Sequence, residues 1–279
     1  MVRPFSASDP YNTPIPSNPA LDPNSSQWIS QLAPHTQWSN LSNTADWGIP
    51  VYQAAASDPV YTMPTLTSYH VAPVHWQVRI PADAQSSRGS DHIVEILEPD
   101  GHTDVDFWGF QWVGGRPTAA MAWETDYGPT GSSINPSVDG ISPGIPIGAL
   151  AGLVLPGEIA QGHIDHALSI ATPTTGPGRL YPFVGHDGPN PGGIPEGARI
   201  QIDPSFNVAA QKWPRWLKVI AVALQRYGAY VTNTSGSLEI YGEAPQTANW
   251  STVGVPDQAA LAALPWAQMR VLAPAASHS

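Results

Sequence analysis

The sequence predicts a mainly β fold, an antiparallel sandwich or jelly-roll-like single domain with one clear α-helix at about 214–227 and short peripheral helices. Three observations support this prediction. Short stretches of alternating apolar and polar residues follow one another along the chain. Turn-forming residues separate them, drawn from 25 glycines and 31 prolines. Only the segment near 214–227 sustains a helical period over several turns.

Six prolines within residues 1–24 exclude a helix there and predict an extended, Pro-rich N-terminal arm. This arm is either a disordered tail or a segment packed on the domain or on a neighbouring subunit. A short helix is expected at 25–32, where Trp28, Ile29 and Leu32 share one side. The domain is expected to span 25–272 and to be followed by a tail at 273–279.

Successive strands are expected at 49–52, 60–63, 74–80, 90–97, 104–110 and 119–124. The sequence Pro99-Asp100-Gly101 joins two of them and is strong hairpin chemistry. Residues 127–148 form a long Gly/Pro/Ser loop, which makes them a candidate binding loop or lid. One or two helical turns are expected within 149–162.

A further strand is expected at 162–172, followed by a second Gly/Pro loop at 173–195 and a strand at 198–203. In the helix at 214–227, Pro214 suits the first turn, Gly228 suits the C′ position, and the apolar residues recur on one face. After it we expect a hairpin formed by 229–232 and 238–241, and a short helix near 258–264.

The charge pattern excludes several partners. The formal net charge is −11, and the only lysines are Lys212 and Lys218. A chain without a basic cluster is a poor ligand for nucleic acid or for an anionic membrane surface. No apolar run reaches the length of a transmembrane helix, and residues 1–30 do not show the pattern of a secretion signal. Cysteine is absent, so thiolate metal sites are excluded; we expect no metal and no cofactor.

Five phrases in this order resemble a family of actinobacterial extracellular proteins and related actinobacteriophage minor tail proteins: residues 9–16, 157–168, 194–204, 223–231 and 264–272. The resemblance covers roughly residues 9 to 272. It implies a β-rich domain that works outside the cell or on a virion, against a cell-envelope polysaccharide. Bacterial relatives begin with a secretion signal, whereas Met1 leads almost directly into the first phrase. We therefore expect the virion tail, with an extracellular bacterial protein as the alternative.

The first candidate for chemistry is the group His163, Asp165 and His166. On a strand, His163 and Asp165 share one face while His166 points to the other, so the three cannot converge on a metal without a bulge. As acid–base machinery, His166 would titrate near neutrality and Asp165 would orient His163. The alternative is a hydrogen-bonded core His166 with His163 and Asp165 on the surface.

Two enzymatic patterns are conceivable for a glycan. In a lyase, Arg199 or Gln201 would neutralise a uronate carboxylate while a Tyr/His pair, such as Tyr181 and His166, moves the protons. A hydrolase needs two carboxylates across a groove, for which the candidates are Asp106, Glu124, Asp126 and Asp203. The alternative is a polar face formed by Arg199, Gln201 and Asp203 and satisfied by neighbouring loops.

The aromatic content favours sugar binding. There are 11 tryptophans, and an indole ring stacks well on the C–H face of a sugar. Trp108, Trp112 and Trp123 lie on or beside the central hairpin and are candidate ligand-binding residues, together with Arg199, Gln201 and Asp203. The alternative for each tryptophan is a place in the core, which the helical period favours for Trp216.

These observations predict a phage minor tail protein that recognises host cell-envelope polysaccharide. The alternatives are a polysaccharide lyase or glycosidase and a purely structural tail component. The expected partners are the envelope glycan and other tail proteins, and a homo-oligomer is left open.

Overall fold

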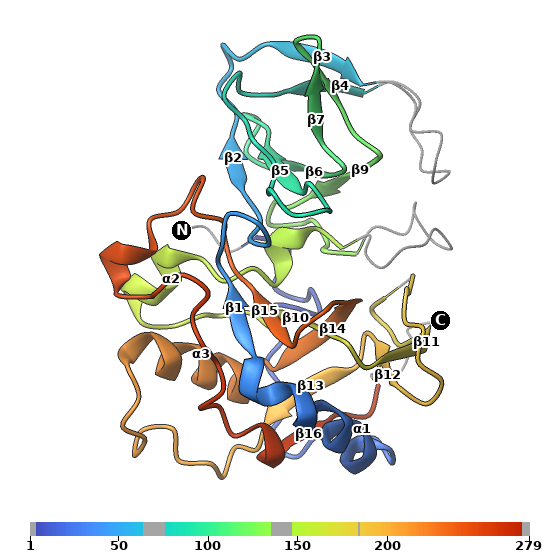
Figure 1. The fold of residues 1–279 in the computed structure, drawn as a ribbon, viewed down its shortest axis with the longest axis vertical. Coiled ribbons are helices and arrows are strands. Elements are labelled where there is room, and N and C mark those ends of the chain that lie inside the picture. The colour runs from blue at the N-terminus through green and yellow to red at the C-terminus, as the bar shows by residue number, and fades with distance from the viewer. Residues whose placement is uncertain (1–3, 64–75, 135–146, 184, 275–279) are drawn as a thin grey trace.

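The computed structural model describes residues 4–63, 76–134, 147–183 and 185–274, and its fold is mainly β and sandwich-like, as predicted (Figure 1). One sheet has four strands in the order β2-β5-β6-β9, and the other has six in the order β1-β15-β10-β14-β13-β16. The pairing is mixed instead of wholly antiparallel, because β2 with β5, β1 with β15 and β10 with β14 run parallel.

The four-stranded sheet comes from the first half of the chain and lies in the upper part of Figure 1. Two hairpins, β3–β4 and β7–β8, pack on its outer face. The strands concerned are β2 (Val51–Gln53), β3 (Val60–Met63), β4 (Trp76–Arg79), β5 (Val94–Leu97), β6 (Thr103–Trp108), β7 (Gln111–Val113), β8 (Arg116–Thr118) and β9 (Met121–Asp126). The predicted strand 74–80 is therefore confirmed from Trp76 onward, and residues 74 and 75 lie outside the described residues.

The six-stranded sheet contains β1 (Asn40–Ser42), β10 (Leu168–Thr172), β13 (Arg199–Ile202), β14 (Ala229–Thr234), β15 (Glu239–Tyr241) and β16 (Met269–Val271). Beside it, β11 (Thr175–Arg179) pairs with β12 (Ile194–Glu196). The helices are α1 (Ser25–Leu32), α2 (Pro156–Gln161) and α3 (Arg215–Arg226), with short 3-10 helices η1 (Ala33–Trp38), η3 (Ala149–Ala151), η4 (Trp250–Val253) and η5 (Trp266–Gln268).

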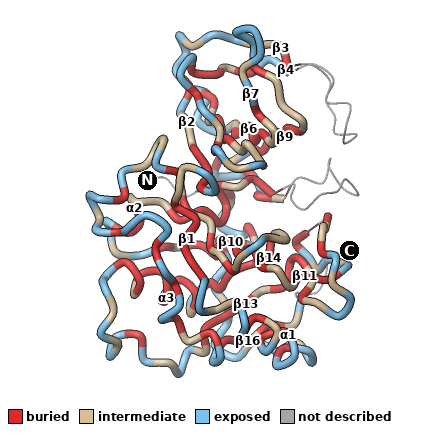
Figure 2. The backbone as a smooth tube through the Cα atoms, viewed as in Figure 1, coloured by how far each residue is buried: buried red, intermediate tan, exposed pale blue. Residues whose placement is uncertain are grey.

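The predicted helix 214–227 is confirmed as α3, which begins after Pro214 and is followed by Gly228 at a positive φ of 72°. Buried and exposed positions alternate along this helix (Figure 2), and its buried apolar residues join those of α1 and of the six-stranded sheet in one hydrophobic cluster. The predicted hairpin of 229–232 and 238–241 is wrong. β14 and β15 both form, but β10 lies between them and pairs with each. The expected helix near 258–264 is also not formed.

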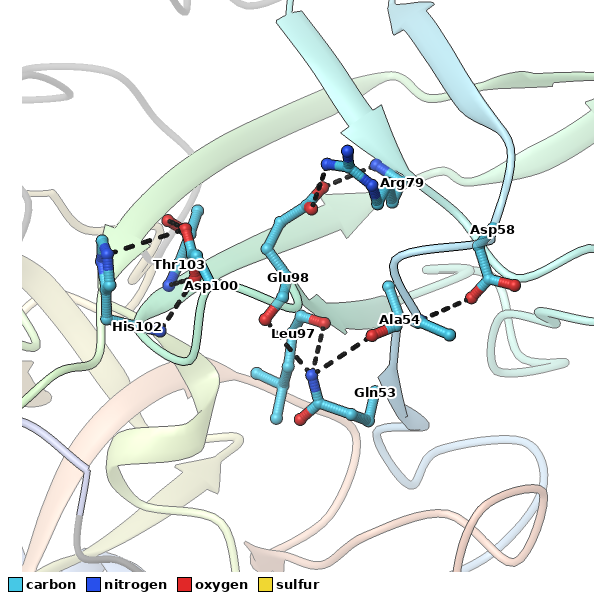
Figure 3. A network of polar contacts seen from close by, with 10 residues as sticks. Gln53, Ala54, Asp58, Arg79, Leu97, Glu98, Asp100, His102 and Thr103 are labelled. Atoms are coloured by element: carbon cyan, nitrogen blue, oxygen red, sulfur yellow. Dashed lines mark hydrogen bonds and ion pairs between the residues drawn. The ribbon is translucent and has the colours of Figure 1, made fainter.

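The hairpin at Pro99-Asp100-Gly101 is confirmed, and its contacts are drawn in Figure 3. The Asp100 carboxylate accepts hydrogen bonds from the backbone N–H groups of His102 and Thr103, at 2.9 Å each. Next to the turn, Glu98 accepts the Arg79 backbone N–H at 2.6 Å and pairs with the Arg79 guanidinium at 3.3 Å. These bonds join the β3–β4 hairpin to the β5–β6 turn.

The described N-terminal residues 4–24 pack on the domain, which is one of the alternatives predicted for the Pro-rich arm, but they run through turns instead of one extended stretch. Residues 4–24 fold back through turns, and Phe5 and Tyr11 are buried in a third hydrophobic cluster with residues 147–151 and Tyr230. The Asp9 carboxylate accepts hydrogen bonds from the backbone and hydroxyl of Ser133, at 2.7 and 2.9 Å. Proline forbids helix but not turns, so these buried anchors decide the path.

Candidate functional site

The predicted strand 162–172 begins only at Leu168. Gly162 adopts a positive φ of 94° and ends α2, so residues 163–167 leave the helix as irregular backbone. A left-handed residue of this kind stops a helix and redirects the chain, which the alternating pattern did not reveal. His163, Asp165 and His166 therefore do not lie on a strand, although His166 is separated from the other two as predicted.

His163 and Asp165 share the surface, as predicted. His163 Nδ1 lies 2.9 Å from Asp165 Oδ2, and Arg226 Nη1 lies 3.2 Å from Asp165 Oδ1. His166 is buried, as the core alternative predicted: its Nε2 lies 2.9 Å from Glu158 Oε1 and its Nδ1 2.7 Å from the Ala167 carbonyl oxygen. One pocket of about 430 Å³ is lined by Glu158, His163, Asp165 and His166.

Arg199 and Tyr181 line a different pocket, of about 360 Å³, beside the N-terminal segment. The Arg199 guanidinium donates to the carbonyl oxygens of Tyr227 and Thr13, at 2.7 and 2.6 Å, and lies over the Tyr230 ring. It therefore fixes the N-terminal segment to the sheet. The predicted lyase group of His166, Tyr181 and Arg199 is thus divided between two pockets.

Gln201 and Asp203 are also held by internal contacts. Buried Gln201 donates to the Gln225 carbonyl oxygen at 2.7 Å and accepts from Arg270 at 2.9 Å. Asp203 accepts from Ser205 and lies 3.5 Å from Arg270. Because β16 supplies Arg270 opposite Gln201, this polar face is satisfied by its neighbours, as the alternative predicted.

The three predicted tryptophans do not form an exposed stacking surface. Trp123 is buried at 8% exposure between the sheets, and half-buried Trp112 contacts Phe110 and Tyr61 edge-on and donates to the Ala84 carbonyl oxygen. Trp108 lies half-buried at the end of β6. Trp216 is in the core, as predicted. The apolar area of an indole stabilises the core as readily as it stacks on a ligand.

The structure forms a pocket that sequence reasoning missed. Its volume is about 410 Å³, and it lies where the 87–91 loop of the upper part meets the ends of β14 and β15. Trp47 stands at its edge with 47% of its surface exposed. Apart from Ile93 and Gly236, the remaining lining is polar: Asp46, Ser87, Ser90, Asp91, Asn233, Thr234, Ser235, Ser237, Glu239, Tyr241 and Gln258.

Local contacts hold the rim of this pocket. The backbone N–H groups of Arg88 and Gly89 donate to the carbonyl oxygens of Ala45 and Asp46, at 2.8 Å each. Gly89 lies against the Trp47 ring, where an added Cβ would come within 2.6 Å of the indole. Only a residue without a side chain fits this contact, so the 44–47 turn and the 87–91 loop together position the indole.

One carboxyl group in the pocket has a strongly altered acidity. Burial raises the pKa of Glu239 to about 7; a hydrogen bond from Ser237 lowers it and the nearby charge of Asp91 raises it. Burial also raises the pKa of the Tyr241 hydroxyl, with a further increase from Glu239. The pocket thus combines a carboxyl group that carries a proton near neutral pH with a second carboxylate, a pattern typical of functional sites.

A second acidic group is fully buried behind this pocket. Glu95, Asp104 and Asp106 place one oxygen each within 4.8 Å of one another. Burial raises the pKa of Glu95 and Asp104 well above the ordinary range and that of Asp106 to about 6. Of the hydrolase candidates, only Asp106 is in this group; Glu124 and Asp126 are exposed on β9, and Asp203 pairs with Arg270.

Comparisons of the chain with models of known protein families, with curated proteins and with solved structures find no match. No helix in the described part of the chain is long and apolar enough to cross a membrane.

Proposed function

We propose that this protein binds a cell-envelope polysaccharide in the pocket beside Trp47. The observation that carries the proposal is a half-exposed indole at the edge of a pocket lined mainly by hydroxyl, amide and carboxyl groups. A sugar presents an apolar C–H face to such a ring and hydroxyl groups to the polar residues.

The charge of the pocket selects the class of sugar. Asp46, Asp91 and Glu239 line it, and none of the described lining residues is an arginine or a lysine. Such a pocket disfavours uronic acids and phosphorylated glycans, because like charges repel when they are partly desolvated. We therefore propose neutral hexoses or amino sugars as the ligands, which also disfavours a lyase acting on acidic polysaccharide.

Two tryptophans provide a matched test. Trp47→Ala should weaken binding of purified host envelope polysaccharide about tenfold or more, measured by isothermal titration calorimetry. Trp38 is more exposed, at 73%, and does not line the pocket, so Trp38→Ala should leave the Kd unchanged. Equal losses in both variants, or no binding by the unaltered protein, would reject the proposal.

The resemblance to minor tail proteins supports a place on a virion, in contact with other tail proteins. Mass spectrometry of purified particles should detect the chain. Antibodies against it should label the tail and reduce adsorption to host cells. Particles that lack the chain would reject the virion location without bearing on glycan binding.

A second candidate function is hydrolysis of the bound glycan. It is favoured by the raised pKa of Glu239, which keeps a proton available for the leaving oxygen, beside Asp91 as the second carboxyl group. New reducing ends should appear with the polysaccharide, and the rate should fall as the pH rises through about 7. Glu239→Gln should abolish cleavage and retain binding. Absence of reducing ends from the unaltered protein would leave binding alone.

A further inference from the structure

The buried acidic residues lie on the face of the four-stranded sheet that is turned toward the six-stranded sheet. Glu95 on β5 is directly opposite Asp106 on β6, and Asp104 is two residues before Asp106. Alternate residues of a strand share a face, so this register brings the three carboxyl groups together. The opposite face carries Val94, Ile96, Val105 and Phe107, which belong to the hydrophobic cluster of the upper part.

The carboxyl oxygens of this group have almost no donors within the described residues. Asp106 Oδ1 accepts the Ala149 backbone N–H at 3.0 Å, whereas both oxygens of Glu95, both of Asp104 and Asp106 Oδ2 meet no N–H or hydroxyl donor. Glu95 and Asp106 can hydrogen-bond to each other only by sharing a proton. No described ion pair reaches any of the three. Buried carboxylates without a donor or a cation are strongly unfavourable, so the group needs a positive charge or protons from outside the chain.

Two further features point to a ligand here. Thr125 on β9 is directly opposite Asp104 on the same face, is 3% exposed, and its hydroxyl also has no partner. Next to the group is a cavity of about 50 Å³, whose polar lining is Asp106 together with Ser169, Thr232, Asn233 and Tyr241 of the other sheet and whose remaining walls are apolar. This volume is sufficient for a water molecule, and hydroxyl groups provide partners for it.

We propose that Glu95, Asp104 and Asp106 bind one Ca²⁺ ion between the two sheets. Calcium takes oxygen ligands at about 2.3–2.6 Å, so two ligands on opposite sides of the ion lie about 5 Å apart, which matches oxygens within 4.8 Å of one another. The Thr125 hydroxyl and water in the neighbouring cavity would complete the coordination. Zinc prefers nitrogen or sulfur ligands, and magnesium keeps more of its water and requires stricter octahedral geometry.

The proposed ion site also lies next to the Trp47 pocket. Tyr241 and Asn233 line both the cavity beside Asp106 and the pocket that contains Trp47. An ion at Asp106 would therefore hold the two sheets together directly behind the wall of that pocket. This site does not depend on the proposed glycan, because none of the three carboxyl groups lines the Trp47 pocket.

The test uses the full chain, freed of metal with EDTA and titrated with CaCl₂ to about 10 mM, above the range of weak extracellular calcium sites. Calorimetry should show one Ca²⁺ bound per chain, and the Tm should rise by about 5 °C at saturation and fall again with EDTA. Asp104→Asn should abolish both effects. If that variant does not fold, Thr125→Val should lower the Ca²⁺ affinity about tenfold.

Two control variants locate the ion. Asp83→Asn alters an exposed aspartate in the upper part, and Asp91→Asn alters the acidic wall of the Trp47 pocket; both should retain calcium binding. The proposal is overturned if the unaltered protein binds no Ca²⁺ and its Tm does not respond, which would mean that the group holds protons. It is also overturned if Asp91→Asn removes binding while Asp104→Asn keeps it, or if only Mg²⁺ or Mn²⁺ binds.

Discussion

Two sets of buried carboxyl groups in this protein differ in what surrounds them. Asp9 and Glu158 are satisfied within the chain: Ser133 donates twice to Asp9, and His166 and the Leu155 backbone contact Glu158. Glu95, Asp104 and Asp106 are equally buried, but among the described residues outside the group only Ala149 donates a hydrogen bond to them. The first set holds separate segments of the chain together. The second set requires something that the chain does not supply, and therefore indicates a site.

The largest expected effect tests the satisfied set. His166→Ala should lower the free energy of unfolding by about 3 kcal/mol, because it leaves the Glu158 carboxylate buried with one fewer partner. Urea denaturation measures the change. His163→Ala is the matched control, since its side chain is 54% exposed and its pair with Asp165 should contribute less than about 0.5 kcal/mol. Similar losses in the two variants would contradict the distinction between a buried pair and a surface pair.

A smaller effect of opposite sign tests the unsatisfied set. In metal-free protein, Asp104→Asn should raise the free energy of unfolding by about 1 kcal/mol, because the buried Asp104 carboxyl group must either take up a proton or carry a charge without a partner, and an amide does neither. Glu158→Gln, the equivalent change in the satisfied set, should lower it by about 2 kcal/mol, because an amide replaces the carboxyl oxygen that lies 2.9 Å from His166 Nε2. Urea denaturation in EDTA compares the two. If both substitutions raised the free energy of unfolding, or both lowered it, the two sets would not differ in the way proposed.

The smallest effect concerns the pH dependence of stability. The pKa of Glu239 is raised from 4.5 to about 7 in the folded protein, so the folded state binds the proton more tightly than the unfolded state. Stability should therefore fall as the pH rises from about 4.5 through 7, by about 1 kcal/mol after allowance for solvent at the pocket. Glu239→Gln should flatten this part of the profile.

Asp203→Asn is the control for that profile. Hydrogen bonds from Ser205 lower the pKa of Asp203, so its contribution to the free energy of unfolding is lost as the pH falls below about 4. Near neutral pH this contribution does not change. A Glu239→Gln profile that remains as steep as that of the unaltered protein between pH 4.5 and 7 would contradict the assignment of the raised pKa to this residue.

Local sequence chemistry predicted some elements well. The period of the residues in α3 and the Pro-Asp-Gly turn at 99–101 depend on neighbours along the chain, and both are formed as expected. The prediction of a strand at 162–167 was wrong because one residue, Gly162, ends a helix there. The hairpin at 229–241 was wrong because a competing strand, β10, pairs with both segments. The Trp47 pocket was missed because segments far apart in the sequence form it.

The sequence by itself determined which side chains share a face. In Val94-Glu95-Ile96 and Asp104-Val105-Asp106, the alternation separates the carboxyl groups from the apolar residues. Taken alone, that pattern is typical of a strand with its acidic side in water. Only the tertiary structure decided that this side is covered, by the second sheet and by the segments 4–12 and 147–151. Alternation is a property of neighbouring residues, whereas burial depends on contacts between distant segments.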